Sequence, residues 1–100
     1  MFKVIYDEEE QICTLECPWC ERNHESNFPH PDATSVLVSH FNNDANSGIP
    51  VCEKIRWTLG ETPWQAVDSE GRVLARGRVV ITQIGNAIQA PQIVQDESQR

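Results

Sequence analysis

The sequence lacks several features that would place a protein in a familiar class. No apolar run approaches the roughly 18 to 20 residues that a helix needs to cross a bilayer. The first residues, Met1 to Tyr6, have neither the long apolar stretch nor the small-residue cleavage site of a secretory signal. We therefore expect a soluble protein of the cytoplasm with no membrane partner.

Motifs of common enzymes are also missing. The chain has no glycine-rich phosphate loop, no nucleophile elbow, no H-E-x-x-H motif and no internal repeat. Zinc catalysis generally relies on an open coordination position with His and carboxylate ligands, whereas cysteine-rich sites are usually closed. We therefore expect that this protein is not an enzyme.

Positive charge is scarce. There are 8 Lys and Arg residues against 15 Asp and Glu residues, so the formal net charge is −7. Binding to phosphate backbones gains free energy mainly when Lys and Arg release counterions, so duplex DNA is an unexpected ligand. An acidic block occupies residues 7–10, and the stretch from 54 to 78 is mildly basic.

The length of 100 residues fits one domain. With 39% hydrophobic and 23% charged residues, the composition is that of a folded globular protein. We predict one domain over residues 1–94 and a flexible tail over 95–100. So small a core gains from an additional cross-link such as a metal ion.

The pattern of strand formers and turn residues predicts an α+β fold. A hairpin over residues 2–6 and 11–16 leads through a loop at 21–31 to a short helix at 32–41, with Asp32 as its cap and Leu37 and Phe41 on one face. Further strands are expected at 51–59, 64–67 and 72–82, and an edge strand interrupted by Pro91 at 84–94. The prediction is a small antiparallel sheet with an N-terminal zinc knuckle and one short helix.

Four cysteines in a reducing compartment indicate metal ligands or free thiols before disulfides. Cys17-Pro18-Trp19-Cys20 can turn two thiolates toward one point, and this C-P-x-C step resembles that of zinc ribbons and zinc fingers. The resemblance covers about a third of the chain. Such a site implies a structural Zn²⁺ with two more ligands, to be found among Cys13, His24, His30, His40 and Cys52.

The remaining ligands are predicted to be His40 and Cys52. Leu37-Val38-Ser39-His40 resembles the L-x-x-H step on the helix of a two-Cys two-His finger, with Phe28 similar to the core aromatic of that family. No second His follows, which leaves the fourth position to Cys52. His24 is the main substitute for His40, because it follows Cys20 closely enough to bind from the same loop.

Other uses of the same cysteines stay open. The string from Cys13 through Cys17 to Cys20 resembles the C-x3-C-x-aromatic-C signature of radical S-adenosylmethionine enzymes, whose thiolates bind an iron–sulfur cluster. The chain is too short, and too rich in hairpins, for the βα units of those enzymes. A thioredoxin-type redox pair, unmetallated thiols and disulfides are further alternatives.

A partner-binding surface is expected on the strand that carries Arg72, Arg76 and Arg78. These arginines share one parity, so with Val73, Ala75, Val79 and Ile81 pointing inward they would lie on one exposed face. Trp19 is expected to be the most exposed tryptophan and to anchor the same partner. The leading hypothesis is a small zinc-binding protein that serves as a protein–protein interaction module or accessory regulator, as some phage-encoded factors do. A nucleic-acid-binding zinc finger and an iron–sulfur or redox protein are the alternatives.

Overall fold

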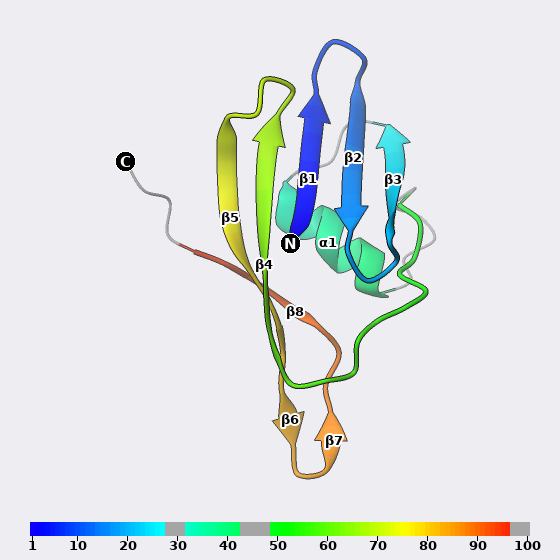
Figure 1. The fold of residues 1–100 in the computed structure, drawn as a ribbon, viewed down its shortest axis with the longest axis vertical. Coiled ribbons are helices and arrows are strands. Elements are labelled where there is room, and N and C mark those ends of the chain that lie inside the picture. The colour runs from blue at the N-terminus through cyan, green and yellow to red at the C-terminus, as the bar shows by residue number, and fades with distance from the viewer. Residues whose placement is uncertain (28–31, 43–48, 97–100) are drawn as a thin grey trace.

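The structure, a computed structural model, describes residues 1–27, 32–42 and 49–96. Its elements are β1 (Phe2–Asp7), β2 (Ile12–Cys17), β3 (Arg22–Asn27), α1 (Ala33–Asn42), β4 (Gly60–Asp68), β5 (Val73–Ile81), β6 (Gln83–Ile84), β7 (Ala87–Ile88) and β8 (Gln92–Gln95) (Figure 1). Six strands form one sheet in the order β3-β2-β1-β4-β5-β8, and β6 pairs only with β7. A sheet with one helix over the described residues agrees with the α+β class.

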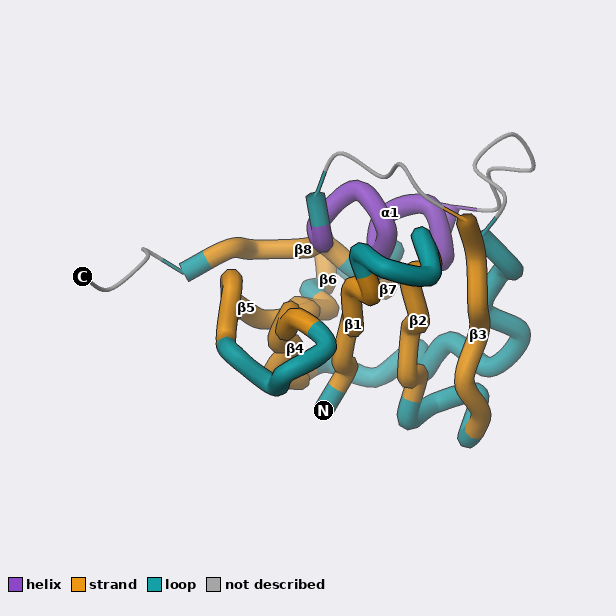
Figure 2. Tube along the Cα trace, turned by 90° about the horizontal axis from the view of Figure 1, so that it is seen from above, coloured by secondary structure: helices purple, strands orange, loops and turns teal. Residues whose placement is uncertain are grey.

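The sheet is mixed, so the prediction of a purely antiparallel sheet is wrong. β1 and β4 run parallel, with Phe2 opposite Trp64 and Tyr6 opposite Asp68, whereas the other neighbours in the sheet are antiparallel. Parallel neighbours need a long crossover connection, and here it comprises β2, β3, α1 and the segment before β4. Figure 2 shows α1 lying across the face of the sheet formed by β1, β2 and β3.

The predicted hairpin of β1 and β2 is present, β4 and β5 form a second one, and an aspartate stabilises each turn. Asp7 accepts hydrogen bonds from the amides of Glu9 and Glu10, each at 3.1 Å, between β1 and β2. Between β4 and β5, Asp68 accepts them from two amides of its own turn, and Gly71 adopts a φ of 84°. A left-handed conformation at this position favours glycine, which has no Cβ.

The predicted helix is confirmed, with its cap. Asp32 Oδ1 accepts a hydrogen bond from the amide of Ser35 at 2.8 Å, which satisfies one of the free donors at the helix start. Leu37 and Phe41 are both buried on the face that packs on the sheet. The helix therefore begins where the sequence predicted and buries the expected face.

Three segments differ from the prediction. Residues 84–94, expected as an edge strand interrupted by Pro91, contain part of the separate β6–β7 pair, and only β8 lies at the edge of the six-stranded sheet. Residues 22–27, expected in a loop, form the edge strand β3, in which His24 is the buried side chain. Residues 51–59, expected as a strand, run as an irregular segment. An edge strand needs little apolar alternation, because one long side is open and most of its side chains face solvent.

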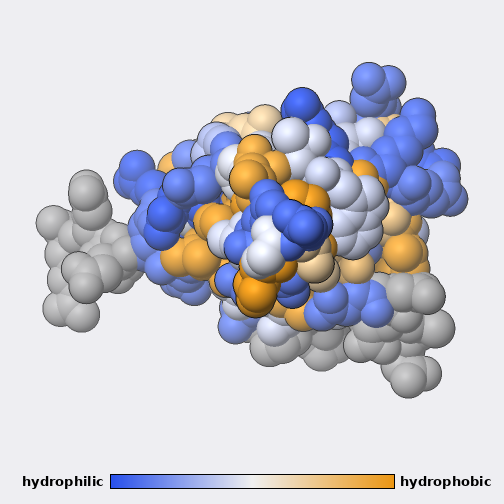
Figure 3. All heavy atoms as spheres, turned by 90° about the horizontal axis from the view of Figure 1, so that it is seen from below, coloured by the Kyte–Doolittle hydropathy of each residue, from blue (hydrophilic) through white to orange (hydrophobic). Residues whose placement is uncertain are grey.

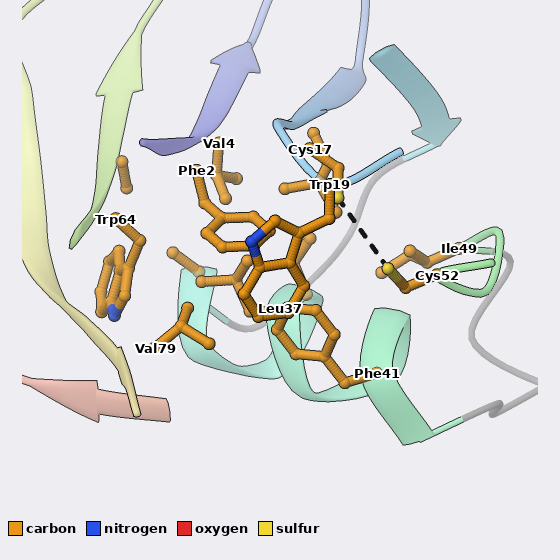
Figure 4. Close-up of a cluster of buried hydrophobic side chains, with 14 of the residues drawn as sticks. Phe2, Val4, Cys17, Trp19, Leu37, Phe41, Ile49, Cys52, Trp64 and Val79 are labelled. Atoms are coloured by element: carbon orange, nitrogen blue, oxygen red, sulfur yellow. Dashed lines mark hydrogen bonds between the residues drawn. The ribbon is translucent and has the colours of Figure 1, made fainter. Parts of the chain in front are cut away.

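The core lies between α1 and the sheet and centres on three aromatic rings (Figure 4). The ring centroids of Phe2 lie 4.9 Å from Trp19 and 5.5 Å from Phe41, both edge-to-face. Trp19 is only 9% exposed, so the expectation that it lies at the surface is wrong. The aromatic cluster fixes the C-terminal turn of α1 beside the end of β2.

The C-terminal end of the described chain closes the other edge of the sheet. Gln95 belongs to β8, and the amide of Asp96 donates to the carbonyl of Arg76 at 3.0 Å. Residues 97–100 of the expected tail lie outside the described residues. No helix in the described ranges is long and apolar enough to pass through a bilayer.

Candidate metal centre

Four predicted ligands meet at one point beside the core. One ligand atom from each of Cys17, Cys20, His40 and Cys52 lies within 4.8 Å of the others. Cys17 ends β2, Cys20 follows in the turn to β3, His40 lies in the last turn of α1, and Cys52 lies in the segment between α1 and β4. This Cys3His group could hold a metal ion.

Three distances within the group are close to those of tetrahedral zinc ligands. The Cys52 Sγ atom lies 3.6 Å from Cys20 Sγ and 4.0 Å from Cys17 Sγ, and Cys20 Sγ lies 3.8 Å from His40 Nε2. Zinc bonds of about 2.3 Å to sulfur and 2.0 Å to nitrogen place two tetrahedral sulfurs about 3.8 Å apart and a sulfur and a nitrogen about 3.5 Å apart. A disulfide would need about 2.05 Å, and the four cysteines are free thiols.

The turn between β2 and β3 points the first two sulfurs into the site. The amide of Cys20 donates to Cys17 Sγ at 3.3 Å, and the amide of Glu21 donates to the carbonyl of Cys17 at 3.0 Å. Glu21 adopts a φ of 58°, which lets the chain reverse directly into β3. Amide donors to sulfur favour the thiolate, the form that binds a metal.

His40 is oriented for coordination through Nε2. Its Nδ1 donates to the carbonyl of Pro50 at 2.5 Å, so Nε2 keeps its lone pair on the side of Cys20. Burial lowers the pKa of His40, and the hydrogen bond to Pro50 opposes this only in part. The lowered pKa favours the neutral ring, which is the form that binds a metal. The amide of Cys52 also donates to the carbonyl of His40 at 2.7 Å, so the backbone of His40 positions Cys52 beside it.

The buried thiols are poor acids without a cation. Burial raises the pKa of Cys17 and of Cys52, and hydrogen bonds from the amides of Cys20 and Lys54 oppose this only in part. A bound divalent cation reverses the balance, because it stabilises the thiolate directly. The chemistry of the donor set therefore suits a metal ion better than a set of free thiolates.

Two alternative ligands lie outside the group of four. His24 is 6% exposed, its ring centroid lies 4.9 Å from that of His40, and its Nε2 has no hydrogen-bond partner within the described residues. Cys13 is buried on β2 four residues before Cys17, which places the two about 13 Å apart along the strand. His30, like Phe28, lies outside the described residues.

The arginines of the predicted partner surface are mostly engaged in ion pairs. Arg76 is exposed and forms no ion pair with any residue that the structure describes, whereas Arg72 and Arg78 each contact two carboxylates. The pairs are Arg72 with Asp68 (2.8 Å) and Glu70 (3.1 Å), and Arg78 with Glu61 (2.8 Å) and Asp96 (3.3 Å). Val79 and Ile81 point inward as expected, but Val73 is 47% exposed, so that part of the prediction is wrong.

Comparison of the chain with family models, with curated proteins and with solved structures finds no match.

Proposed function

We propose that this chain is a small zinc protein in which Cys17, Cys20, His40 and Cys52 bind one structural Zn²⁺, and that it serves as a protein–protein interaction module or accessory regulator. One observation carries the metal part of the proposal: four soft or borderline donor atoms converge within 4.8 Å of one another. Three thiolates and one imidazole form a donor set typical of structural zinc.

Burial favours a structural role over a catalytic one. Cys17, His40 and Cys52 are buried and Cys20 is half-buried, so the group has little room for a substrate. Four protein ligands complete a tetrahedron, whereas a catalytic zinc keeps a position open. When bound, the ion would offset most of the charge of the three thiolates and join the turn after β2 to α1 and to the segment before β4.

An interaction role is supported by what the surface exposes. Large apolar side chains remain at the surface of this small domain, among them Trp57 at 55%, Leu59 at 53% and Ile84 at 71%. A contiguous exposed apolar patch is typical of an interaction surface, and Trp57 and Leu59 lie two residues apart on one segment. A regulator of a larger partner needs a stable scaffold and one such surface, and a single metal cross-link supplies stability at this size.

The metal part is tested on purified protein by elemental analysis and by native mass spectrometry. We expect one zinc per chain, and loss of cooperative unfolding after removal by a chelator, because the binding free energy of a structural site contributes to folding. Cys17→Ser should abolish zinc binding. Stoichiometric iron in place of zinc, or a metal-free protein that unfolds cooperatively at neutral pH, would overturn the proposal.

A further inference from the structure

The segment formed by residues 54–59 joins the candidate metal centre to the sheet. It follows Cys52 and leads into β4, and it passes the end of the molecule where β6 and β7 project (Figure 1, green trace). The segment has no regular secondary structure of its own. Its position is nevertheless determined at both ends.

Contacts on each side hold the backbone of this segment. The amide of Lys54 hydrogen-bonds to the sulfur of Cys52, and Gly60 pairs with Ile81 at the start of β4. Between them, Ile55 packs against the core. Because the backbone of this segment is already held in place, less conformational entropy is lost when its remaining side chains bind a partner.

Two of those side chains are large, apolar and exposed. Trp57 is 55% exposed and Leu59 is 53% exposed, while Trp19 and Trp64 belong to the core. Figure 3, viewed toward the end where β6 and β7 project, shows apolar side chains at the surface among polar ones. Tryptophan is the residue most enriched at binding hot spots, so its exposure on a held segment indicates a contact surface.

The same segment carries the cations that the protein leaves unpaired at this end. Lys54 and Arg56 are exposed and form no ion pair with any residue in the described ranges, whereas Arg22, like Arg72 and Arg78, is paired with a carboxylate. The flanking carboxylates Glu53 and Glu61 are paired with Arg22 and Arg78. The charges left free on the segment are therefore positive and complement an acidic partner.

A pocket of about 140 Å³ adjoins these residues. Arg56 and Leu59 line it from the segment, Trp19 from the core, and Val79 and Ile81 from β5. Glu61 of β4 also lines it and is paired with Arg78 at 2.8 Å. An apolar side chain of a partner would enter among Leu59, Val79 and Ile81, and a neighbouring carboxylate would then lie beside the guanidinium of Arg56.

We infer that residues 54–59 form the docking surface for an acidic segment of another protein that carries a large apolar residue between carboxylates. This inference rests on the proposed interaction function and specifies its surface and its partner. It places the contact on Lys54, Arg56, Trp57 and Leu59 rather than on the arginine strand. A phosphate backbone fits less well, because Lys54 and Arg56 offer only two phosphate contacts and no apolar side chain of such a ligand would enter the pocket.

The experiment measures fluorescence anisotropy of a labelled synthetic peptide with the repeating sequence Glu-Asp-Leu, titrated with full-length, metal-loaded protein. Matched probes are the same peptide with serine at each leucine and a short single-stranded oligothymidine. The variants are Arg56→Glu and Trp57→Ala, with Arg76→Glu as the control for charge reversal at an unpaired arginine elsewhere. Each variant is checked for zinc content and for its melting temperature.

We expect the Glu-Asp-Leu peptide to bind, and Arg56→Glu and Trp57→Ala each to weaken it by about tenfold or more. Arg76→Glu and the serine peptide separate this surface from general charge attraction: the control variant should bind as tightly as the wild type, and the serine peptide should bind weakly. No binding, an equal loss in Arg76→Glu, equal binding of the serine peptide, or tighter binding of oligothymidine would each overturn the inference. Zinc analysis of the same samples reports on the metal centre separately, so a failure there is distinguishable from a failure of the surface.

Discussion

Replacing Gly77 by alanine tests how β5, β8 and Trp64 pack at the edge of the sheet. A Cβ added at Gly77 would lie 2.6 to 2.7 Å from ring atoms of Trp64 and would overlap the carbonyl oxygen of Val94. Trp64 is 1% exposed, and its indole nitrogen donates to that same carbonyl at 3.1 Å. In the Gly77→Ala variant, the indole of Trp64 or the backbone of β8 at Val94 must therefore move.

The expected cost has two parts. Overpacking a buried site costs about 1 to 3 kcal/mol, and losing the indole hydrogen bond costs about 1 kcal/mol more. A total of about 3 kcal/mol corresponds to a fall in melting temperature of about 12 °C or more for a domain of this size. Metal content should stay at one ion per chain, because the change lies outside the metal centre.

The assay is thermal unfolding followed by circular dichroism in the presence of excess zinc. Gly71→Ala is the matched control: its site is open but has a φ of 84°, so backbone strain alone should cost about 1 kcal/mol. If Gly77→Ala melts within a few degrees of the wild type, or no lower than Gly71→Ala, the packing of β8 against Trp64 is not as described.

Three further predictions concern the site and the surface. Cys13→Ser should keep full metal stoichiometry in native mass spectrometry, whereas Cys20→Ser should lose it, because only Cys20 belongs to the group of four; metal loss from Cys13→Ser would contradict the ligand set. Burial raises the pKa of Cys17 and Cys52, so metal binding must displace protons, and the logarithm of the apparent zinc affinity should rise by about two or more per pH unit near pH 7. A competition titration with a chromogenic chelator at several pH values would measure this slope, and a flat profile would refute it. In a mobility-shift assay at physiological salt, duplex DNA should remain unbound, because Arg76 and the few other free cations offer too few phosphate contacts; submicromolar, salt-sensitive binding would contradict this.

The sequence predicted the features that depend on local patterns. Asp32 identified the start of α1, and the C-P-x-C step identified the turn after β2, because caps and tight turns are set by a few neighbouring residues. The L-x-x-H step also placed His40 on the buried face of α1. These predictions coincide with the group of four donors that the structure brings together.

The features that failed depend on contacts between distant residues. Phe2 lies opposite Trp64, 62 positions further along the chain, in a parallel strand pair. The residues around Phe2 do not indicate this partner, because strand pairing depends on the whole sheet. Trp19 adjoins a turn, which suggested exposure, but Phe41 and Phe2 bury it from two other elements. The group that orients His40 is the backbone carbonyl of Pro50. Every residue has such a carbonyl, so the residue type at position 50 could not predict this contact.

The crossover between β1 and β4 also orders events during synthesis. Every donor of the metal centre lies between Cys17 and Cys52, and all of them precede β4, β5 and β8 in the chain. On a ribosome the complete donor set therefore emerges before the second half of the sheet does. Metal acquisition need not wait for that half, and a closed centre would hold β2, β3 and α1 together until β4 arrives to pair with β1.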